Sequence, residues 1–410
     1  MVYFTDGPSV MSVQADTSGP DLRLNGEAAL TILSALIGAA LILVVLWDGF
    51  ETIVLPRRVT RRFRLTRLFY RRTWSAWSGL GGRAFSGARL ETWLSYFGPL
   101  SLLVLMALWA VALIVGFALL YFASGSALDT RGGEPGLLTY VYMSGTNFFT
   151  LGLGDVTPRG GTGRFLTVAE AGLGFGLLAL VIGYLPALNQ SFSRREVSIS
   201  LLDARAGTPP TAAGLLMRHG HERGLDPLRQ LLFEWEQWSA ELMESHLSYP
   251  VLAYFRSQHD NQSWLAALTA VLDTCALIMA GLEGACKRQA ELTFAIARHA
   301  VVDLALVFRI PPLEPRRDRL PEGELDRLRK MLAEAGLRLG TGEEADNRLK
   351  ELRRMYEPYV YALSKRFKLP LPPWAPATAR SDNWQTSAWE KKSDNLPSGG
   401  EKGGDDDRHF

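Results

Sequence analysis

Cysteine and histidine are scarce in this chain of 410 residues, and together they form no metal-ligand pattern. Cys275 and Cys286 are the only cysteines, so neither a disulfide framework nor a zinc site is predicted. His219 and His221 stand two residues apart, a spacing that does not share one helix face, and we interpret them as a solvent-exposed loop pair. We therefore expect no resident metal and no cofactor.

Several motifs of soluble enzymes and sensors are also missing. We find no constellation of nucleophile and base, so we interpret the chain as not being an enzyme. No G-x-G-x-x-G follows a strand pattern in residues 200–370, which argues against a Rossmann-type domain there. Residues 1–27 lack the basic start and cleavage site of a secretory signal, so we expect no processing. No nucleic-acid partner is expected either.

What the chain does contain is a set of long apolar runs, all in its first half. Residues 28–47 and 100–122 are uncharged, and residues 165–188 carry a single acid, Glu170. Each run is long enough to cross a ~30 Å hydrocarbon core as a helix. The sequence thus predicts an all-α membrane protein with three transmembrane helices.

A dense run of arginine follows the first apolar segment. Eight arginines lie between Arg57 and Arg72 with no acid among them, which places this end of the helix in the cytoplasm. Their spacing resembles a voltage-sensor helix in part, but the apolar residues and partner helices of such a sensor are missing. Beyond a topology signal, the run could bind anionic lipid headgroups. The candidates for lipid binding are Arg57, Arg58, Arg61, Arg62, Arg64 and Arg67.

The second and third apolar runs enclose a glycine-rich stretch, Thr146-Asn147-Phe148-Phe149-Thr150-Leu151-Gly152-Leu153-Gly154-Asp155. A dehydrated cation needs a dense cage of oxygens, and aiming successive carbonyls at one point requires backbone conformations that glycine tolerates best. Irregular backbone at membrane depth is tolerated only where it lines such a cavity or is buried in protein. The stretch resembles the selectivity filter of the potassium channel family, T-x-G-[YFL]-G-D. Residues 137–149 before it read as a short pore helix.

The resemblance implies roles for individual residues of a two-helix pore with an extra N-terminal span. The filter would consist of Thr150, Leu151, Gly152, Leu153, Gly154 and Asp155, with carbonyls of the first four and the Thr150 hydroxyl lining the ion sites. Tyr142 and Thr146 would support it from the pore helix. Gly174 falls at the family's hinge in the inner helix, and Pro186 permits a second kink. Leu153 and Thr146 depart from the best-known filters, which have Tyr and, in some members, Glu there.

Two segments leave alternatives open. Glu170 could bond to the back of the filter, or it could set filter stability or proton sensitivity, because an acid within a span needs a partner in either case. Residues 264–282 could form a fourth span, but Asp273 lies within them and we favour a buried helix of a soluble bundle. Residues 74–97 carry Trp and Tyr among small residues, as expected along a membrane interface.

The sequence therefore predicts seven regions. They are an extracytoplasmic tail (1–27), a first transmembrane helix (28–55), a basic cytoplasmic and interfacial segment (56–96), a potassium channel pore domain (97–190), a linker (191–211), an all-helical cytoplasmic domain (212–370) and a disordered tail (371–410).

The predicted function is passive potassium conduction by a homotetramer in a cell membrane, the bacterial inner membrane by composition. The N-terminus would lie outside and the C-terminus in the cytoplasm, with potassium ions and, as a possibility, anionic lipids as partners. A weakly selective cation channel and a non-conducting membrane receptor or scaffold remain as alternatives.

Overall fold

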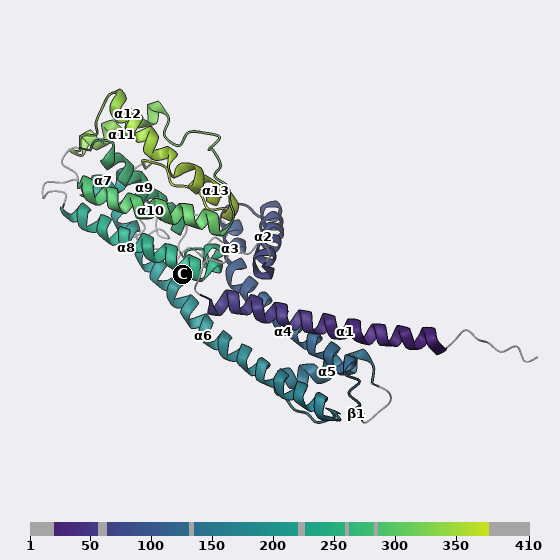
Figure 1. The fold of residues 1–410 in the computed structure, drawn as a ribbon. Helices are drawn as coiled ribbons and strands as arrows, with labels where there is room; N and C mark the ends of the chain where they lie inside the picture. Colours follow the sequence, from purple (N-terminus) through teal and green to yellow (C-terminus); the bar gives the residue numbers. More distant parts are fainter. Residues whose placement is uncertain are drawn as a thin grey trace, which may run out of the picture. The chain divides into compact units, whose positions relative to one another are not determined.

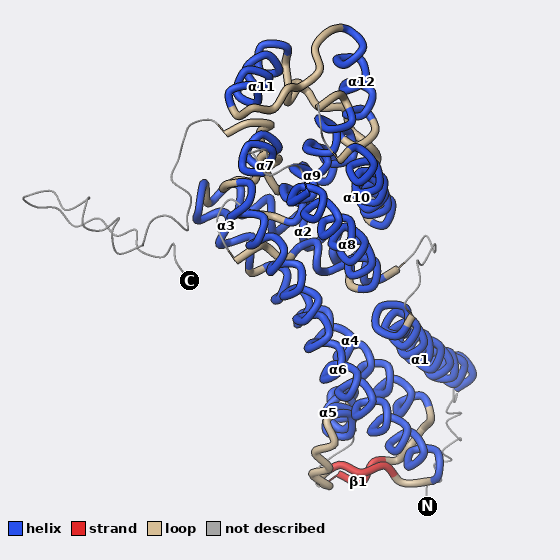
Figure 2. Tube along the Cα trace, turned by 90° about the vertical axis from the view of Figure 1, so that its left-hand side faces the viewer, coloured by secondary structure: helices blue, strands red, loops and turns tan. Residues whose placement is uncertain are grey.

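The computed structural model describes residues 20–55, 64–130, 135–219, 226–258, 262–282 and 286–376, with side chains from residue 28 (Figures 1 and 2). This part of the chain is an all-α membrane protein joined to a helical domain. It forms two compact units, the first from described residues within Met1–Phe50 and Met106–Val181, the second from those within Glu51–Leu105 and Ile182–Phe410.

Three helical stretches are long and apolar enough to cross a membrane, as the sequence predicts. They are Ala28–Val54, Gly87–Ala123 and Gly161–Ala206. The helices that form them are α1 (Pro20–Gly49) with the π-helical turn η1 (Phe50–Val54), α3 (Gly87–Ser95) with α4 (Phe97–Ala123), and α6 (Gly161–Ala206).

The first unit contains α1, most of α4, the short helix α5 (Leu137–Phe148) and the first half of α6. Helices α1 and α4 approach closely at glycines, since a Cβ on Gly38 would lie 2.6 Å from the Gly116 carbonyl oxygen. Small residues at such crossings let helices pack tightly in lipid. The indole N–H of Trp109 donates to the buried carboxylate of Asp48 over 3.2 Å, which gives this acid of the first span a partner.

Helix α6 is longer than its apolar run. It continues for 46 residues, about 69 Å, and so passes through part of the region expected to be a linker. Its last turns remain helical because Arg195, Ile199 and Leu202 form a stripe that is buried in the second unit.

The segment between the first two spans packs onto protein. Helix α2 (Leu65–Ala84) buries Tyr70 and Trp74 on one face, and Trp74 is 1% exposed. Its indole N–H donates to the Arg366 carbonyl over 2.7 Å, and its ring meets Tyr254. The expected membrane-interface position is therefore wrong for Trp74, because its ring and N–H are satisfied within the second unit.

The remaining helices form a bundle around α9 (Trp264–Met279), which contacts α7, α8, α10, α12 and α13. Every residue from 264 to 278 is buried, so the apolar run here is a bundle core, as favoured from the sequence. The other elements are α7 (Ala212–His219), α8 (Asp226–Ser248), the 3-10 turn η2 (Pro250–Tyr254), α10 (Lys287–Val307), α11 (Glu322–Glu334), α12 (Glu343–Arg354) and α13 (Glu357–Phe367).

Asp273, the acid that argued against a fourth span, lies fully buried within α9. Arg319 donates to both of its carboxylate oxygens, at 3.2 and 2.6 Å, and the Tyr356 hydroxyl donates to one of them. Burial alone lowers the pKa of Arg319, but Asp273 and Glu357 outweigh it, so the pKa is raised. The charge pair is thus compensated inside the bundle.

Candidate functional site

The glycine-rich stretch follows directly on α5, which is the expected pore helix. Phe149 caps α5, and the next two amides fold back onto its last turn. The Thr150 N–H donates to Asn147 O over 2.9 Å and the Leu151 N–H to Thr146 O over 2.8 Å. The helix end carries partial negative charge, which favours a cation beyond it.

The backbone from residue 150 to residue 154 alternates between left-handed and right-handed conformations. Thr150, Gly152 and Gly154 have φ values of 55°, 58° and 71°, while Leu151 and Leu153 are not among the residues with positive φ. In an ordinary strand successive carbonyls point to opposite sides, whereas alternating left- and right-handed conformations turn them to the same side. A β-branched threonine in the left-handed region costs about 1–3 kcal/mol and is found mainly at functional sites.

The carbonyl oxygens of this stretch have no donor within the described part of the chain. Leu151 and Leu153 are 62% and 61% exposed, so their side chains lie at the surface of the chain. Unpaired carbonyls in a row can coordinate a dehydrated cation, provided that other oxygens complete the cage.

Asp155 is held at the end of this stretch by the pore helix. The Tyr142 hydroxyl donates to Asp155 Oδ2 over 2.9 Å. Thr146, which replaces an acid of some filters, instead donates to the Met143 carbonyl of its own helix. Tyr142 therefore provides the brace of Asp155 that Thr146 does not.

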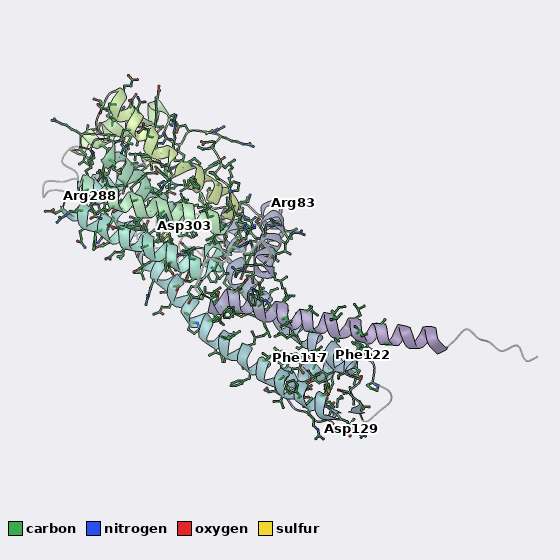
Figure 3. All side chains as sticks on the ribbon, in the orientation of Figure 1. Arg83, Phe117, Phe122, Asp129, Arg288 and Asp303 are labelled. Atoms are coloured by element: carbon green, nitrogen blue, oxygen red, sulfur yellow. The ribbon has the colours of Figure 1, made fainter. Side chains whose placement is uncertain are left out.

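A short ribbon carries the chain away from Asp155. Strand β1 (Leu128–Thr130) pairs antiparallel with β2 (Val156–Pro158), the two strands drawn in red in Figure 2, with Asp129 opposite Thr157. The Arg159 guanidinium reaches Asp129 over 2.9 Å, and Asp129 is labelled in Figure 3.

Helix α6 presses against the back of the pore helix at Gly174. A Cβ at this position would overlap the Phe148 carbonyl oxygen, so only glycine fits. A Cβ added at the nearby Gly172 or Gly176 would meet no atom within 4 Å. The structure thus gives Gly174 a packing role, and its role as a hinge stays a prediction.

Glu170 is completely buried behind the same helix. It accepts a hydrogen bond from the Tyr121 hydroxyl of α4 over 3.0 Å and contacts the Ser144 hydroxyl of α5. These contacts are with α4 and α5 rather than with residues 150–155, so a bond from Glu170 to the filter itself stays a prediction. The sequence analysis did not name the partners of Glu170. The available signal was a polar side chain in each of two apolar helices, Tyr121 in α4 and Ser144 in α5.

Comparison with known proteins agrees with this geometry. Residues 107–190 match the family model described as "Ion channel". The chain carries an ion channel domain. The match runs from α4 through α5 and the filter stretch into α6, so it covers the elements described above.

Two relatives resemble longer or shorter parts of the chain. The uncharacterized membrane protein YdjJ of Bacillus subtilis (strain 168) is 25% identical over 301 residues, which are 72% of this chain and 85% of that protein. Protein LctB of Bacillus caldotenax is 31% identical over 84 residues, 18% of this chain and 62% of that protein. No solved structure matches.

The other predicted residues have varied positions. Pro186 lies inside α6, which continues through it, so no sharp break marks the second hinge. Arg57, Arg58, Arg61 and Arg62 lie outside the described residues, as does His221. Arg64 donates to the Glu51 carbonyl and to Thr52, so its guanidinium is engaged within the chain; Arg67 is half-buried on α2.

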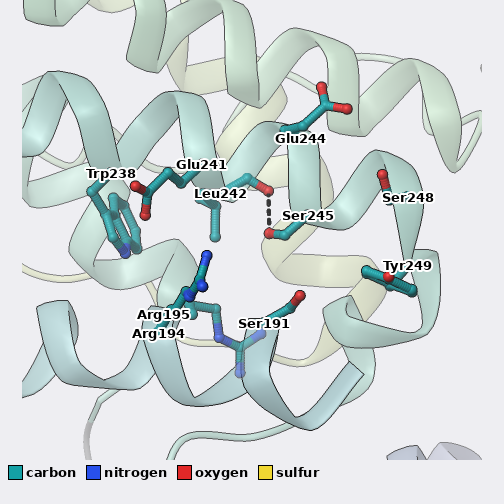
Figure 4. Close-up of a pocket in the computed structure, with 10 residues that line it drawn as sticks. All are labelled: Ser191, Arg194, Arg195, Trp238, Glu241, Leu242, Glu244, Ser245, Ser248 and Tyr249. Atoms are coloured by element: carbon teal, nitrogen blue, oxygen red, sulfur yellow. Dashed lines mark hydrogen bonds between the residues drawn. The ribbon is translucent and has the colours of Figure 1, made fainter. Parts of the chain in front are cut away.

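The last turns of α6 are fastened to the helical domain by Arg195. Its guanidinium is buried and donates to Leu252 O and Phe255 O, each over 2.9 Å, at the end of η2. Beside it a cavity of about 280 Å³ is lined by Ser191 and Arg194 of α6 and by α8 residues that include Trp238 and Glu241 (Figure 4). This end of α6 is thus attached to the helical domain.

Proposed function

We propose that this protein is the subunit of a homotetrameric channel that conducts potassium passively across a bacterial cell membrane. The observation that carries the proposal is the alternation of φ sign from Thr150 to Gly154, which prepares a row of carbonyls to face one side. The match of residues 107–190 to an ion channel family supports it.

Assembly follows from the geometry of coordination. One chain offers one row of carbonyls, and a dehydrated ion needs oxygens all around it, so four chains around one axis would complete each ion site. Ions would then displace one another through stacked sites formed by Thr150, Leu151, Gly152 and Leu153. Asp155 would attract cations at the outer mouth, held in place by Tyr142.

The orientation follows from the arginine run. Eight arginines after the first span favour a cytoplasmic position for residues 57–72, which puts the N-terminus outside and the helical domain in the cytoplasm. In this orientation the filter faces outward, as a potassium-channel pore requires.

A weakly selective cation channel is the second candidate, because Leu153 lacks the hydroxyl that braces many filters. Flux from liposomes that contain the purified full chain, with potassium or sodium as the only permeant cation, separates the two. We expect potassium flux that is lost in Gly152→Ala, since a Cβ at φ 58° strains the filter backbone.

The outcomes of this experiment differ clearly. Equal flux of both cations would replace potassium selectivity with the second candidate. Flux that is unchanged by Gly152→Ala would contradict conduction through these carbonyls. No flux at any pH or lipid composition, from protein that remains folded, would favour a membrane receptor or scaffold.

A further inference from the structure

The cluster around Glu170 joins three helices at one buried point. Glu170 belongs to α6, Ser144 to the pore helix α5 and Tyr121 to α4, and Glu170, Ser144 and Tyr121 each have 0% exposure. Both carboxyl oxygens of Glu170 have partners, Oε2 the Tyr121 hydroxyl and Oε1 the Ser144 hydroxyl. The carboxyl group is therefore the one contact shared by all three helices at this level.

The Ser144 hydroxyl has one hydrogen but contacts two oxygen atoms, those of the Ile114 carbonyl and of Glu170 Oε1. The Ser144 Oγ lies 2.7 Å from the Ile114 carbonyl oxygen, and because a carbonyl can only accept, the hydrogen of this contact comes from Ser144. That assignment leaves the contact between Ser144 and Glu170 without a hydrogen. A proton on Glu170 Oε1 supplies it, so that the carboxyl donates to Ser144, which donates to Ile114.

The surroundings hold no charge that could compensate a carboxylate. Among the described residues no ion pair reaches Glu170; its carboxyl contacts the hydroxyls of Tyr121 and Ser144, and the Tyr121 hydroxyl in turn contacts Thr167 and the amide of Asn147. Tyr121, from α4, is the only titratable side chain among these contacts. An ionised acid without a cation is costly inside a membrane-spanning bundle.

We propose that Glu170 carries its proton and acts as a positioning residue for the filter. The neutral carboxyl donates to Ser144 and accepts from Tyr121, and so holds the pore helix against α4 and α6. Its effect on conduction rests on the proposed function, whereas the presence of the proton does not.

Glutamine is the matched replacement. In Glu170→Gln the amide N–H₂ can donate to Ser144 and the amide oxygen can accept from Tyr121, so a protonated acid is reproduced. Glu170→Ala removes both bonds and leaves two buried hydroxyls without their partner. A carboxylate would instead be imitated poorly by glutamine, because the charge and one of the two acceptor oxygens are lost.

The proton is tested by infrared spectroscopy of the purified full chain in lipid. We expect the wild type minus Glu170→Gln difference spectrum to show the C=O stretching band of a protonated carboxylic acid. This band should shift in Ser144→Ala, which removes its hydrogen-bond partner. Carboxylate bands in place of the acid band would overturn the proposal, whether or not the protein conducts.

The positioning role is tested by potassium and sodium flux. We expect Glu170→Gln to keep potassium flux within about twofold of the wild type and Glu170→Ala to lower it about tenfold or more, as loss of buried hydrogen bonds predicts. Should Glu170→Ala fail to fold, Tyr121→Phe replaces it, because it removes the hydroxyl that donates to Glu170 and also contacts Thr167 and Asn147. Wild-type flux and selectivity in Glu170→Ala, or in Tyr121→Phe where it replaces Glu170→Ala, would contradict the positioning role.

Discussion

Gly174 shows how far a single residue fixes the contact between the inner helix and the pore helix. A Cβ on this residue would overlap the Phe148 carbonyl oxygen, which leaves no space for alanine. We expect Gly174→Ala to destabilise the assembled protein by about 1–3 kcal/mol, as overpacking does, and to lower its thermal unfolding midpoint.

Gly172→Ala is the matched control, since a Cβ there meets nothing within 4 Å. A helix-interior glycine replaced by alanine without a clash is tolerated or slightly stabilised. If Gly174→Ala has the same thermal unfolding midpoint as the control but alters channel opening, the result would favour a role of Gly174 as a hinge over a role in packing.

Helix α9 contains one member of a buried charge pair, Asp273, whose partner is Arg319. Removing one partner of a buried pair leaves the other charge uncompensated, at a cost of about 3–5 kcal/mol. We expect Asp273→Ala to lower the stability of the helical domain by up to this amount, because Arg319 would lose its shorter ion pair and keep only the one with Glu357. Denaturant unfolding of the full chain, followed by circular dichroism, measures the change.

Arg288→Ala provides the comparison. Arg288, labelled in Figure 3, pairs with Glu291 on α10 over 3.2 Å at the surface, where such pairs contribute ~0–1 kcal/mol. A shift for Asp273→Ala no larger than that for Arg288→Ala would show that the buried pair does not hold the bundle.

The second unit as a whole should be sensitive to acid through His246. Its Nδ1–H donates to the Leu242 carbonyl over 2.8 Å, and its ring is completely buried. Burial, together with the charge of Arg195, lowers the pKa of His246 to about 3. Between pH 6.5 and 3 the unfolded chain binds a proton that the folded chain excludes, so folding weakens as pH falls through this window.

We expect this residue to contribute a loss of stability of about 1.4 kcal/mol for each pH unit below about 6.5. Thermal unfolding at about pH 7 and about pH 5 measures it, and His246→Gln should show a smaller difference between the two. An equal pH dependence in both proteins would assign the acid sensitivity to other groups.

Much of the chain's architecture could be predicted because it depends on local patterns. Apolar runs indicated the three spans. The filter roles of Thr150 to Asp155, inferred from a compact motif, stay a prediction. The buried position of residues 264–278 followed from the cost of Asp273 within a membrane.

The parts that were not predicted depend on contacts distant in sequence. Trp74 looks like an interfacial residue until Arg366, 292 residues away, supplies its carbonyl. The extension of α6 to Ala206 requires the acceptors of Leu252 and Phe255, which no local pattern reveals. The compact units likewise divide at residues 105 and 181 because the ends of α4 and α6 pack with the helical domain.

The attachment of Arg195 has a consequence for how such a protein can be shortened in evolution. Residues 195–206 present a buried arginine and the apolar side chains of Ile199, Leu202 and Ala206 to their own helical domain. Loss of that domain would expose this stripe to water. It would also remove the two main-chain carbonyls that accept hydrogen bonds from Arg195. A relative reduced to the pore alone should therefore either end before residue 195 or carry polar residues along this stripe.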